Sequence, residues 1–285
     1  MRIIIGGGGR VGTGLAKALR SEAKDVVLVD NNARAVKNSQ GMDILVLRGD
    51  ITQRDKFIEA GIETARLDTE VLLAHVLGQE RIYLYTHFDR PLTPSERDAF
   101  RALVKRRYKR EPVAYILGEK EFYGRPFKVD SSTLIPRPET EHLIDGILKW
   151  CKQEHASANP QKPLSILDVG TGSGCIAVTL ACELENVEIT AVDISKDALQ
   201  VAEHNARVLG VSEKVSFVHG DLFDGLQERS FQLIVSNPPY VEESLKGSLS
   251  PDVLDFEPSN ALFAGEDGMA IIRRLIPLSA EHLQP

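Results

Sequence analysis

The sequence predicts an α/β protein whose strands lie parallel. Short apolar runs alternate with stretches in which apolar residues recur at helical spacing, which is the pattern of strand–helix–strand units. Two of the runs lead into glycine-rich turns, at residues 6–9 and 170–174, each followed by a helical stretch. Residues 61–110, between these two regions, show helical spacing alone. We therefore expect an N-terminal βαβαβ unit, a small helical region and a larger α/β domain.

The N-terminal unit is expected over residues 1–60. Three apolar runs there have the length of buried strands: Ile3–Ile5, Val26–Val29 and Ile44–Leu47. Helical spacing follows the first run, so the strands are joined through helices. Such connections predict a parallel sheet.

The helical region is expected over residues 61–120. Apolar residues fall on one helical face before Gly78, which stands where a C-terminal cap belongs. Thr93-Pro94-Ser95-Glu96 is a capping box with proline at the first helical position. The helix that it opens ends in a basic run, Lys105–Arg110.

The larger domain is expected over residues 121–285 and begins with a hairpin linker at 121–140. The hairpin is expected around Gly124-Arg125-Pro126. Strands are then expected at Ile166–Val169, Ile189–Val192, Val215–Val218 and Phe231–Val235, and helices at Cys175–Leu184, Lys196–Leu209 and Gly268–Leu283.

Composition excludes several classes of protein. The chain has 285 residues, 42% hydrophobic and 26% charged, which is ordinary for a globular protein. No apolar run approaches the roughly 18 residues that span a bilayer. Three cysteines without paired spacing, and histidines without ligand spacing, favour a reducing cytoplasm and no metal. Net charge is +3 over residues 1–60, +2 over 61–130 and −12 over 131–285, so bulk charge disfavours nucleic acid as a partner of the last region.

The second glycine turn predicts a cofactor site. It contains Gly170, Thr171, Gly172, Ser173 and Gly174, directly after the strand that ends at Val169. Glycines let a ligand touch the backbone, and the helix N-terminus that follows offers free N–H groups. Asp193 ends the next strand, where a carboxylate can accept hydrogen bonds from ribose hydroxyls. The spacing G-x-G-x-G differs from the dinucleotide fingerprint and fits an adenosine cofactor without a pyrophosphate.

A second motif, Asn237-Pro238-Pro239-Tyr240, predicts the reacting end of the site. It follows the apolar run Phe231–Val235, and its two prolines make a stiff turn. The side-chain oxygen of Asn237 and a backbone carbonyl can then face one –NH₂ group and orient its nitrogen toward a methyl donor. Tyr240 can pack on a flat target group.

Residues 61–285 resemble the HemK/PrmC family of protein-(glutamine-N5) methyltransferases. The two motifs above carry this resemblance, together with four further stretches of sequence. These are Gly61–Asp68, Glu111–Gly118, Leu134–Glu141 and Ala261–Gly268. The resemblance implies a Rossmann-like S-adenosylmethionine-dependent methyltransferase domain that modifies a glutamine of peptide-chain release factors in the cytoplasm.

The same resemblance implies roles for individual residues. Residues 170–174 would cradle S-adenosylmethionine, Asp193 would hold its ribose, and Asp221 and Leu222 would lie beside its adenine. Asn237 would also border the cofactor. Asn237, Pro238, Pro239 and Tyr240 would bind the glutamine carboxamide. Arg137 and Glu139 would lie near the mouth of the site, and Lys105–Arg110 would contact the release factor; a solvated helix face is the alternative for that basic run.

Residues 1–60 resemble the first half of the TrkA-N (RCK) nucleotide-binding domain of potassium-uptake regulators. Gly7, Gly9 and Gly12 follow the first strand with G-x-G-x-x-G spacing, and Asp30 ends the second strand. These four residues are a candidate site for NAD or ATP. The favoured alternative is a Rossmann fragment used only for packing.

The two resemblances meet near Glu59–Glu63, and the second lacks the last strands of its family. We therefore expect a fusion or a truncated product in which an uncovered sheet edge invites self-association. Two alternative functions remain open. One is amino-methylation of adenine in DNA or RNA, and the other is a nucleotide-sensing module of a potassium transporter, which depends on residues 1–60 alone.

Overall fold

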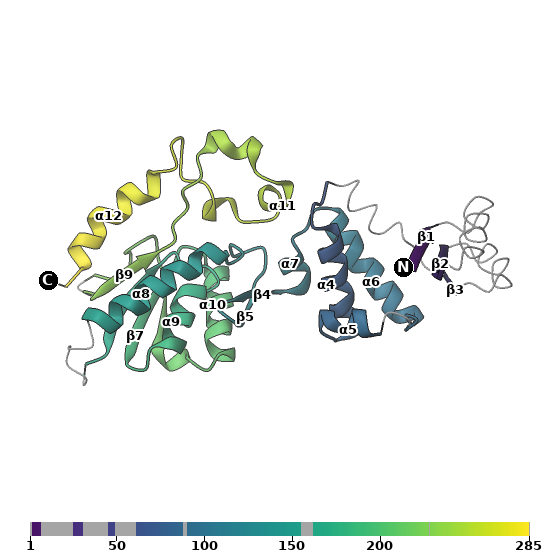
Figure 1. Ribbon diagram of the computed structural model, residues 1–285. Coiled ribbons are helices and arrows are strands. Elements are labelled where there is room, and N and C mark those ends of the chain that lie inside the picture. Colours follow the sequence, from purple (N-terminus) through teal and green to yellow (C-terminus); the bar gives the residue numbers. More distant parts are fainter. Residues whose placement is uncertain are drawn as a thin grey trace. The chain divides into compact units, whose positions relative to one another are not determined.

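The computed structural model describes residues 61–87, 90–154, 162–227 and 229–284, together with three strands within the first 60 residues (Figure 1). By its internal contacts the chain divides into two units, Met1–Arg110 and Glu111–Pro285. The candidate nucleotide residues Gly7, Gly9 and Gly12 lie outside the described residues, as do the helices expected between the first strands.

The three N-terminal strands form a parallel sheet, as predicted. The strands β1 (Arg2–Gly6), β2 (Asp25–Asp30) and β3 (Leu45–Arg48) pair in the order β1-β2-β3. Asp30 ends β2 opposite Arg48 of β3. This order agrees with strands that follow one another through helical connections.

Three helices follow in the same unit: α4 (Ala65–Leu77), α5 (Arg81–Thr86) and α6 (Pro94–Tyr108). Gly78 caps α4 in the left-handed conformation, with φ of 60°. Thr93 and Glu96 form the predicted capping box at the start of α6. Both sequence signals for helix ends are therefore confirmed.

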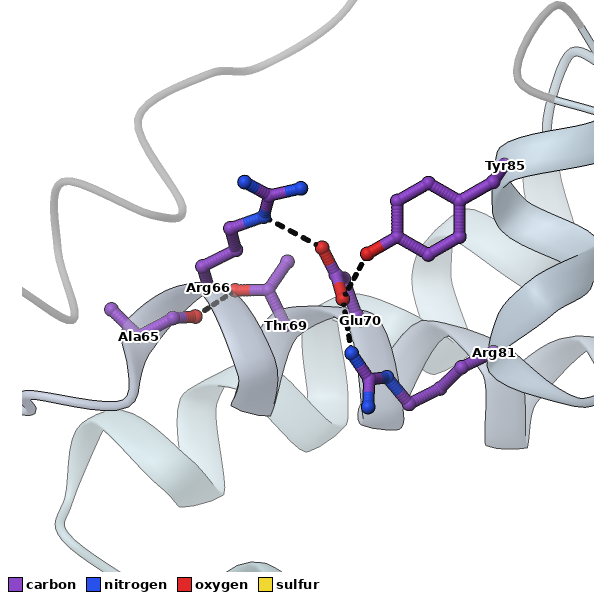
Figure 2. Close-up of polar contacts among 6 residues, drawn as sticks. All are labelled: Ala65, Arg66, Thr69, Glu70, Arg81 and Tyr85. Carbon is purple, nitrogen blue, oxygen red and sulfur yellow. Dashed lines mark hydrogen bonds and ion pairs between the residues drawn. The ribbon is translucent and has the colours of Figure 1, made fainter.

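Glu70 of α4 accepts three hydrogen bonds, one from within α4 and two from α5, so that it joins the two helices (Figure 2). Its carboxylate accepts from Arg66 Nε, Arg81 Nη2 and the Tyr85 hydroxyl, each at 2.8 Å. These three donors, Arg66 first, lower the pKa of Glu70 to about 2.

The basic run at the end of α6 does not form one exposed face. Arg107 is buried and donates from Nε to Asp68 Oδ2 at 2.6 Å. Arg110 donates from Nη1 to the carbonyl of Gly61 at 2.8 Å. The sequence analysis predicts Lys105–Arg110 as a single contact surface. Arg107 and Arg110 instead bind groups of their own unit.

The second unit begins with α7 (Val113–Leu117) and a hairpin of β4 (Glu119–Phe122) and β5 (Arg125–Lys128). Its turn is at Tyr123-Gly124, so Arg125 and Pro126, expected in the turn, belong to β5. The α/β part follows with η1 (Pro138–Thr140), α8 (Glu141–Glu154), β6 (Leu164–Val169), α9 (Cys175–Glu183), β7 (Val187–Asp193), α10 (Lys196–Val208), η2 (Ser212–Lys214), β8 (Val215–His219) and β9 (Leu233–Ser236). It ends with η3 (Glu243–Ser248), α11 (Pro251–Leu254), η4 (Ser259–Ala261) and α12 (Ala270–His282).

Besides the antiparallel hairpin, this unit contains a sheet of four parallel strands in the order β8-β7-β6-β9. Alternate residues of β6 face opposite sides of the sheet. Ile166 packs with residues of α8, α9 and α10 in one core cluster, whereas Leu167 and Val169 pack with Phe223 in another, against which α12 lies. Figure 1 shows α8, α9 and α10 grouped together and α12 apart from them. The sheet is therefore covered on both faces, which is the expected Rossmann-like architecture.

The strand β9 lies at one end of this sheet. Beyond its start, Phe231 pairs with Leu283 in a parallel bridge, and Gln284 donates its backbone N–H to the carbonyl of Phe231 at 2.9 Å. Self-association through this edge stays a prediction.

None of the helices in the described ranges has the length and apolar character needed to cross a membrane.

Candidate active site

A cavity of about 340 Å³ lies at the carboxyl ends of the four parallel strands, where ligands of open α/β sheets bind. Its wall includes one residue at or after the carboxyl end of each strand: Gly170 after β6, Asp193 at the end of β7, Asp221 after β8 and Asn237 after β9. Because β8 and β9 lie at opposite ends of the strand order, Asp221 and Asn237 mark opposite ends of the cavity. The volume is within the range of about 300–1,000 Å³ typical of small-molecule sites.

The glycine turn forms the middle of the cavity wall. Gly170 and Gly172 have φ of 74° and 56°, and a Cβ placed on either would meet no heavy atom within 4 Å. The backbone therefore stands open to a ligand there. Gly174 differs, because it does not line the cavity and a Cβ on it would lie 2.9 Å from Ala202 Cβ. Its lack of a side chain lets α9 approach α10.

Asp193 is fixed at the end of β7 with both carboxylate oxygens engaged. Oδ2 accepts from the backbone N–H of Gly172 at 2.8 Å, and Oδ1 accepts from that of Ser195 at 2.9 Å. Each oxygen keeps a second lone pair that can accept from a ligand hydroxyl. An open glycine turn beside an oriented carboxylate fits the ribose of a nucleoside cofactor.

Asp168 lies behind this wall and is fully buried. Its Oδ2 accepts from the Thr171 hydroxyl at 2.6 Å and from the backbone N–H of Ala177 at 3.2 Å. Burial raises the pKa of Asp168 to about 7. The residue anchors the glycine turn to the first turn of α9, a role that the sequence did not assign.

The loop after β8 forms the end of the cavity where the resemblance implies adenine. Asp221 and Leu222 both line it, and Leu222 has φ of 55°, which is uncommon for a residue with a side chain. Asp221 Oδ2 accepts from Nη2 of Arg274, a residue of α12, at 2.7 Å. Arg274 lines the cavity as well and was missed by sequence reasoning.

The turn after β9 forms the other end. Asn237, Pro238 and Pro239 line the cavity, whereas Tyr240 is 66% exposed and does not. Asn237 Nδ2 donates to Thr140 Oγ1 at 3.4 Å, and none of the described residues donates a hydrogen bond to its Oδ1. The amide is therefore held so that its acceptor is available to a ligand.

Two segments far apart in the sequence are joined by an ion pair at the cavity wall. Glu257 is buried, and its Oε1 accepts from Arg137 Nη2 at 2.6 Å while Oε2 accepts from the backbone N–H of Ile135 at 3.2 Å. Arg137 lines the cavity, as expected of a residue near its mouth, but Glu139 is exposed and does not. Sequence reasoning missed Glu257.

Asn205 of α10 supports the site from behind. It is buried, and its Nδ2 donates to the carbonyls of Ser173 at 2.8 Å and Lys128 at 3.0 Å. The glycine turn and the hairpin are thus joined through one side chain. Within the described residues, no three His, Cys, Asp or Glu side chains form a group that could hold a metal.

This parallel sheet, with a glycine turn after one strand and Asn-Pro-Pro-Tyr at the end of another, defines a Rossmann-like methyltransferase domain. Consistent with this, residues 155–250 match the family model of the methyltransferase small domain, and residues 53–118 match that of the PrmC N-terminal domain. The chain belongs to the release factor glutamine methyltransferase family. The resemblance expected from the sequence is therefore confirmed.

The relatives establish this membership. The release factor glutamine methyltransferase of Rhodopirellula baltica is 44% identical over 230 residues, covering 80% of this chain and 77% of the relative. That of Koribacter versatilis is 46% identical over 232 residues, covering 81% and 80%. Among solved structures, the hMettl16 catalytic domain in complex with MAT2A 3'UTR hairpin 6 matches with a TM-score of 0.47 and 18% identity, covering 62% of this chain and 64% of that chain.

The N-terminal resemblance is confirmed as well, because residues 3–69 match the TrkA-N domain model. This match overlaps the PrmC N-terminal match over residues 53–69. Nucleotide binding by Gly7, Gly9, Gly12 and Asp30 stays a prediction.

Proposed function

We propose that this chain transfers a methyl group from S-adenosylmethionine to the side-chain amide nitrogen of a glutamine in a peptide-chain release factor, in the cytoplasm. The observation that carries the proposal is Asn237, held by Thr140 at one end of a cavity whose other walls are Gly172, Asp193 and Asp221. Membership of the release factor glutamine methyltransferase family supports the same substrate.

The cofactor site consists of the glycine turn, Asp193 and the loop after β8. Gly170 and Gly172 leave room for a ligand against the backbone, and the Asp193 carboxylate would accept from ribose hydroxyls. Asp221 and Leu222 would border the adenine. When bound, S-adenosylmethionine supplies an electrophilic methyl group on a sulfonium sulfur.

Asn237 would orient the nucleophile. A carboxamide nitrogen is a poor nucleophile because its lone pair is delocalised into the carbonyl. The Oδ1 of Asn237 and the backbone carbonyl of Pro238 would accept its two N–H bonds and direct the nitrogen at the methyl carbon. The same two acceptors would stabilise the positive charge that develops on nitrogen as the N–C bond forms and the bond between the methyl group and the sulfonium sulfur breaks. The proton then leaves to water.

Four residues keep the side-chain oxygen of Asn237 in place. Thr140 holds its amide nitrogen, and Ser236 donates from Oγ to the carbonyl of Val169 at 2.7 Å, which ties the end of β9 to β6. Pro238 and Pro239 limit rotation of the turn. The helices of the first unit would contact the release factor.

A transfer assay tests this proposal. The chain is incubated with labelled S-adenosylmethionine and either a purified release factor or DNA and RNA, beside N237A. We expect label in the release factor with the wild-type chain and at least a hundredfold less with N237A, the order of loss for an oriented polar group that acts on the transition state. Label in nucleic acid alone would favour adenine methylation instead.

A further inference from the structure

The ion pair between Arg274 and Asp221 is unusual for its position rather than its strength. Both side chains are partly exposed, at 52% and 37%, and pairs of this kind add little to stability. Both nevertheless line the cavity, and the pair connects α12 to the loop after β8 across 53 residues of sequence. A contribution to folding stability therefore explains little about this ion pair, whereas a role in binding a ligand would explain its position at the cavity.

The side chains at this end of the cavity lack an aromatic ring. The lining includes Ile194 after β7, Ala198 in the first turn of α10, Leu222 after β8 and Ile271 in the first turn of α12, all aliphatic. Phe263 is the one aromatic among the described lining residues, and it pairs with Val241 just beyond the Asn237 turn, at the opposite end. A flat heterocycle here would meet aliphatic groups and a single planar one, the guanidinium of Arg274.

A guanidinium group can both cover a flat ring and hold the carboxylate of Asp221. Its planar face stacks on aromatic rings, and its fork of N–H donors holds a carboxylate in a fixed direction. With Oδ2 of Asp221 engaged by Arg274, the remaining lone pairs of the carboxylate stay available to an amino group on a ligand.

We propose that Arg274 is a positioning residue of the cofactor site, which orients Asp221 and covers the nucleobase with its guanidinium plane. This rests on the proposed function, because it takes S-adenosylmethionine as the ligand of the cavity. Through Ile271, which packs with Leu222 and Phe223, the first turns of α12 become part of the nucleobase site.

Arg273 provides a matched control on the same helix. It forms an ion pair with Asp267, with Nη1 to Oδ1 at 3.0 Å, and does not line the cavity. Replacement of either arginine removes one positive charge and one ion pair from α12. A difference between the two variants therefore reports position in the site and not charge.

The test is calorimetric titration of S-adenosylhomocysteine into wild type, R274A, R274K and R273A, with unliganded melting temperatures to verify folding. We expect R274A and R274K to bind S-adenosylhomocysteine about 3- to 30-fold more weakly than the wild type, because neither alanine nor lysine has a planar group. R273A should bind it as the wild type does. At saturating cofactor, kcat for the release factor should stay within about twofold, since Arg274 is remote from the Asn237 end.

Each other result counts against a specific claim. Wild-type affinity in R274A would overturn the role of Arg274, and wild-type affinity in R274K would show that the planar group is not used. Equal weakening in R273A would reduce the effect to charge. Absence of binding by the wild-type chain would instead overturn the proposed cofactor, and the inference with it.

Discussion

Thr140 accepts a hydrogen bond from the side-chain amide of Asn237 at 3.4 Å, although 97 residues separate them in sequence. Thr140 is buried at the end of η1, directly before α8, and Asn237 follows β9. The contact engages the donor of the amide and leaves its acceptor for a ligand. Two segments of the domain thus define the direction of one oxygen atom.

Replacement of Thr140 by valine should weaken this alignment. The change keeps the volume and removes the hydroxyl, so we expect kcat for release-factor methylation to fall about 2- to 12-fold, equivalent to one hydrogen bond of about 0.5–1.5 kcal/mol. Steady-state kinetics measure it. T179V is the control, because Thr179 is buried with no partner for its hydroxyl among the described residues and should keep wild-type kcat. Equal activity of T140V and wild type would show that Thr140 does not orient Asn237 for catalysis.

Gly268 is required by the turn that contains Asn237. A Cβ on Gly268 would lie 2.2 Å from the carbonyl oxygen of Tyr240, and its φ of 69° is unfavourable for other residues. We expect G268A to displace this turn and lower methylation at least tenfold, since small misplacements of reacting groups are costly. Binding of S-adenosylhomocysteine should change little.

Gly247 offers a control for that substitution. A Cβ on Gly247 would meet no heavy atom within 4 Å. The residue lies in η3, which follows the Asn237 turn in the sequence. G247A should therefore retain wild-type methylation. Full activity in G268A would show that the position of the Tyr240 carbonyl does not matter for catalysis.

The Arg107–Asp68 pair, which joins α6 to α4, should contribute strongly to the stability of the first unit. Their side chains are only 6% and 8% exposed, so R107M leaves a buried carboxylate without its partner. We expect a loss of about 3–5 kcal/mol in the free energy of unfolding, measured by urea titration with circular dichroism. R101M removes an exposed pair with Asp98 and should cost less than about 1 kcal/mol. Similar losses in the two variants would refute this difference.

Glu70 should make the stability of the first unit sensitive to acid. Its folded pKa of about 2 lies below the ordinary value of 4.5, because Arg66, Arg81 and Tyr85 bind the ionised form. The stabilisation is complete above about pH 4.5 and is lost as the pH falls through about 2. Melting temperatures of wild type and E70Q should differ most above about pH 4.5 and converge near pH 2. A difference that is constant over this range would contradict the assignment.

The sequence predicted the parts of the site that occur in contiguous motifs. Gly172 lies after β6 and Asp193 ends the neighbouring strand β7. Parallel strands bring their carboxyl ends together, so the contact between these two residues could be expected. Asn237 could also be predicted, because the two prolines that follow it after an apolar run indicate a stiff turn. The four strands β6, β7, β8 and β9 could be predicted from their apolar runs.

The contacts that orient these residues could not be predicted, because each joins segments far apart in the chain. Arg137 and Glu257 are 120 residues apart, and Asp221 and Arg274 are 53 apart. No periodicity marks either pair. The burial of Arg107 was missed for a related reason, since a run of basic residues carries no sign of which one turns toward a carboxylate on another helix.

Mass spectrometry of a release factor after incubation with the chain and S-adenosylmethionine tests the central claim most directly. The account predicts one added methyl group, located by fragmentation on the side-chain nitrogen of a glutamine, and its loss with N237A. A methyl group on any other residue, or an unmodified release factor with an active control enzyme alongside, would contradict the account.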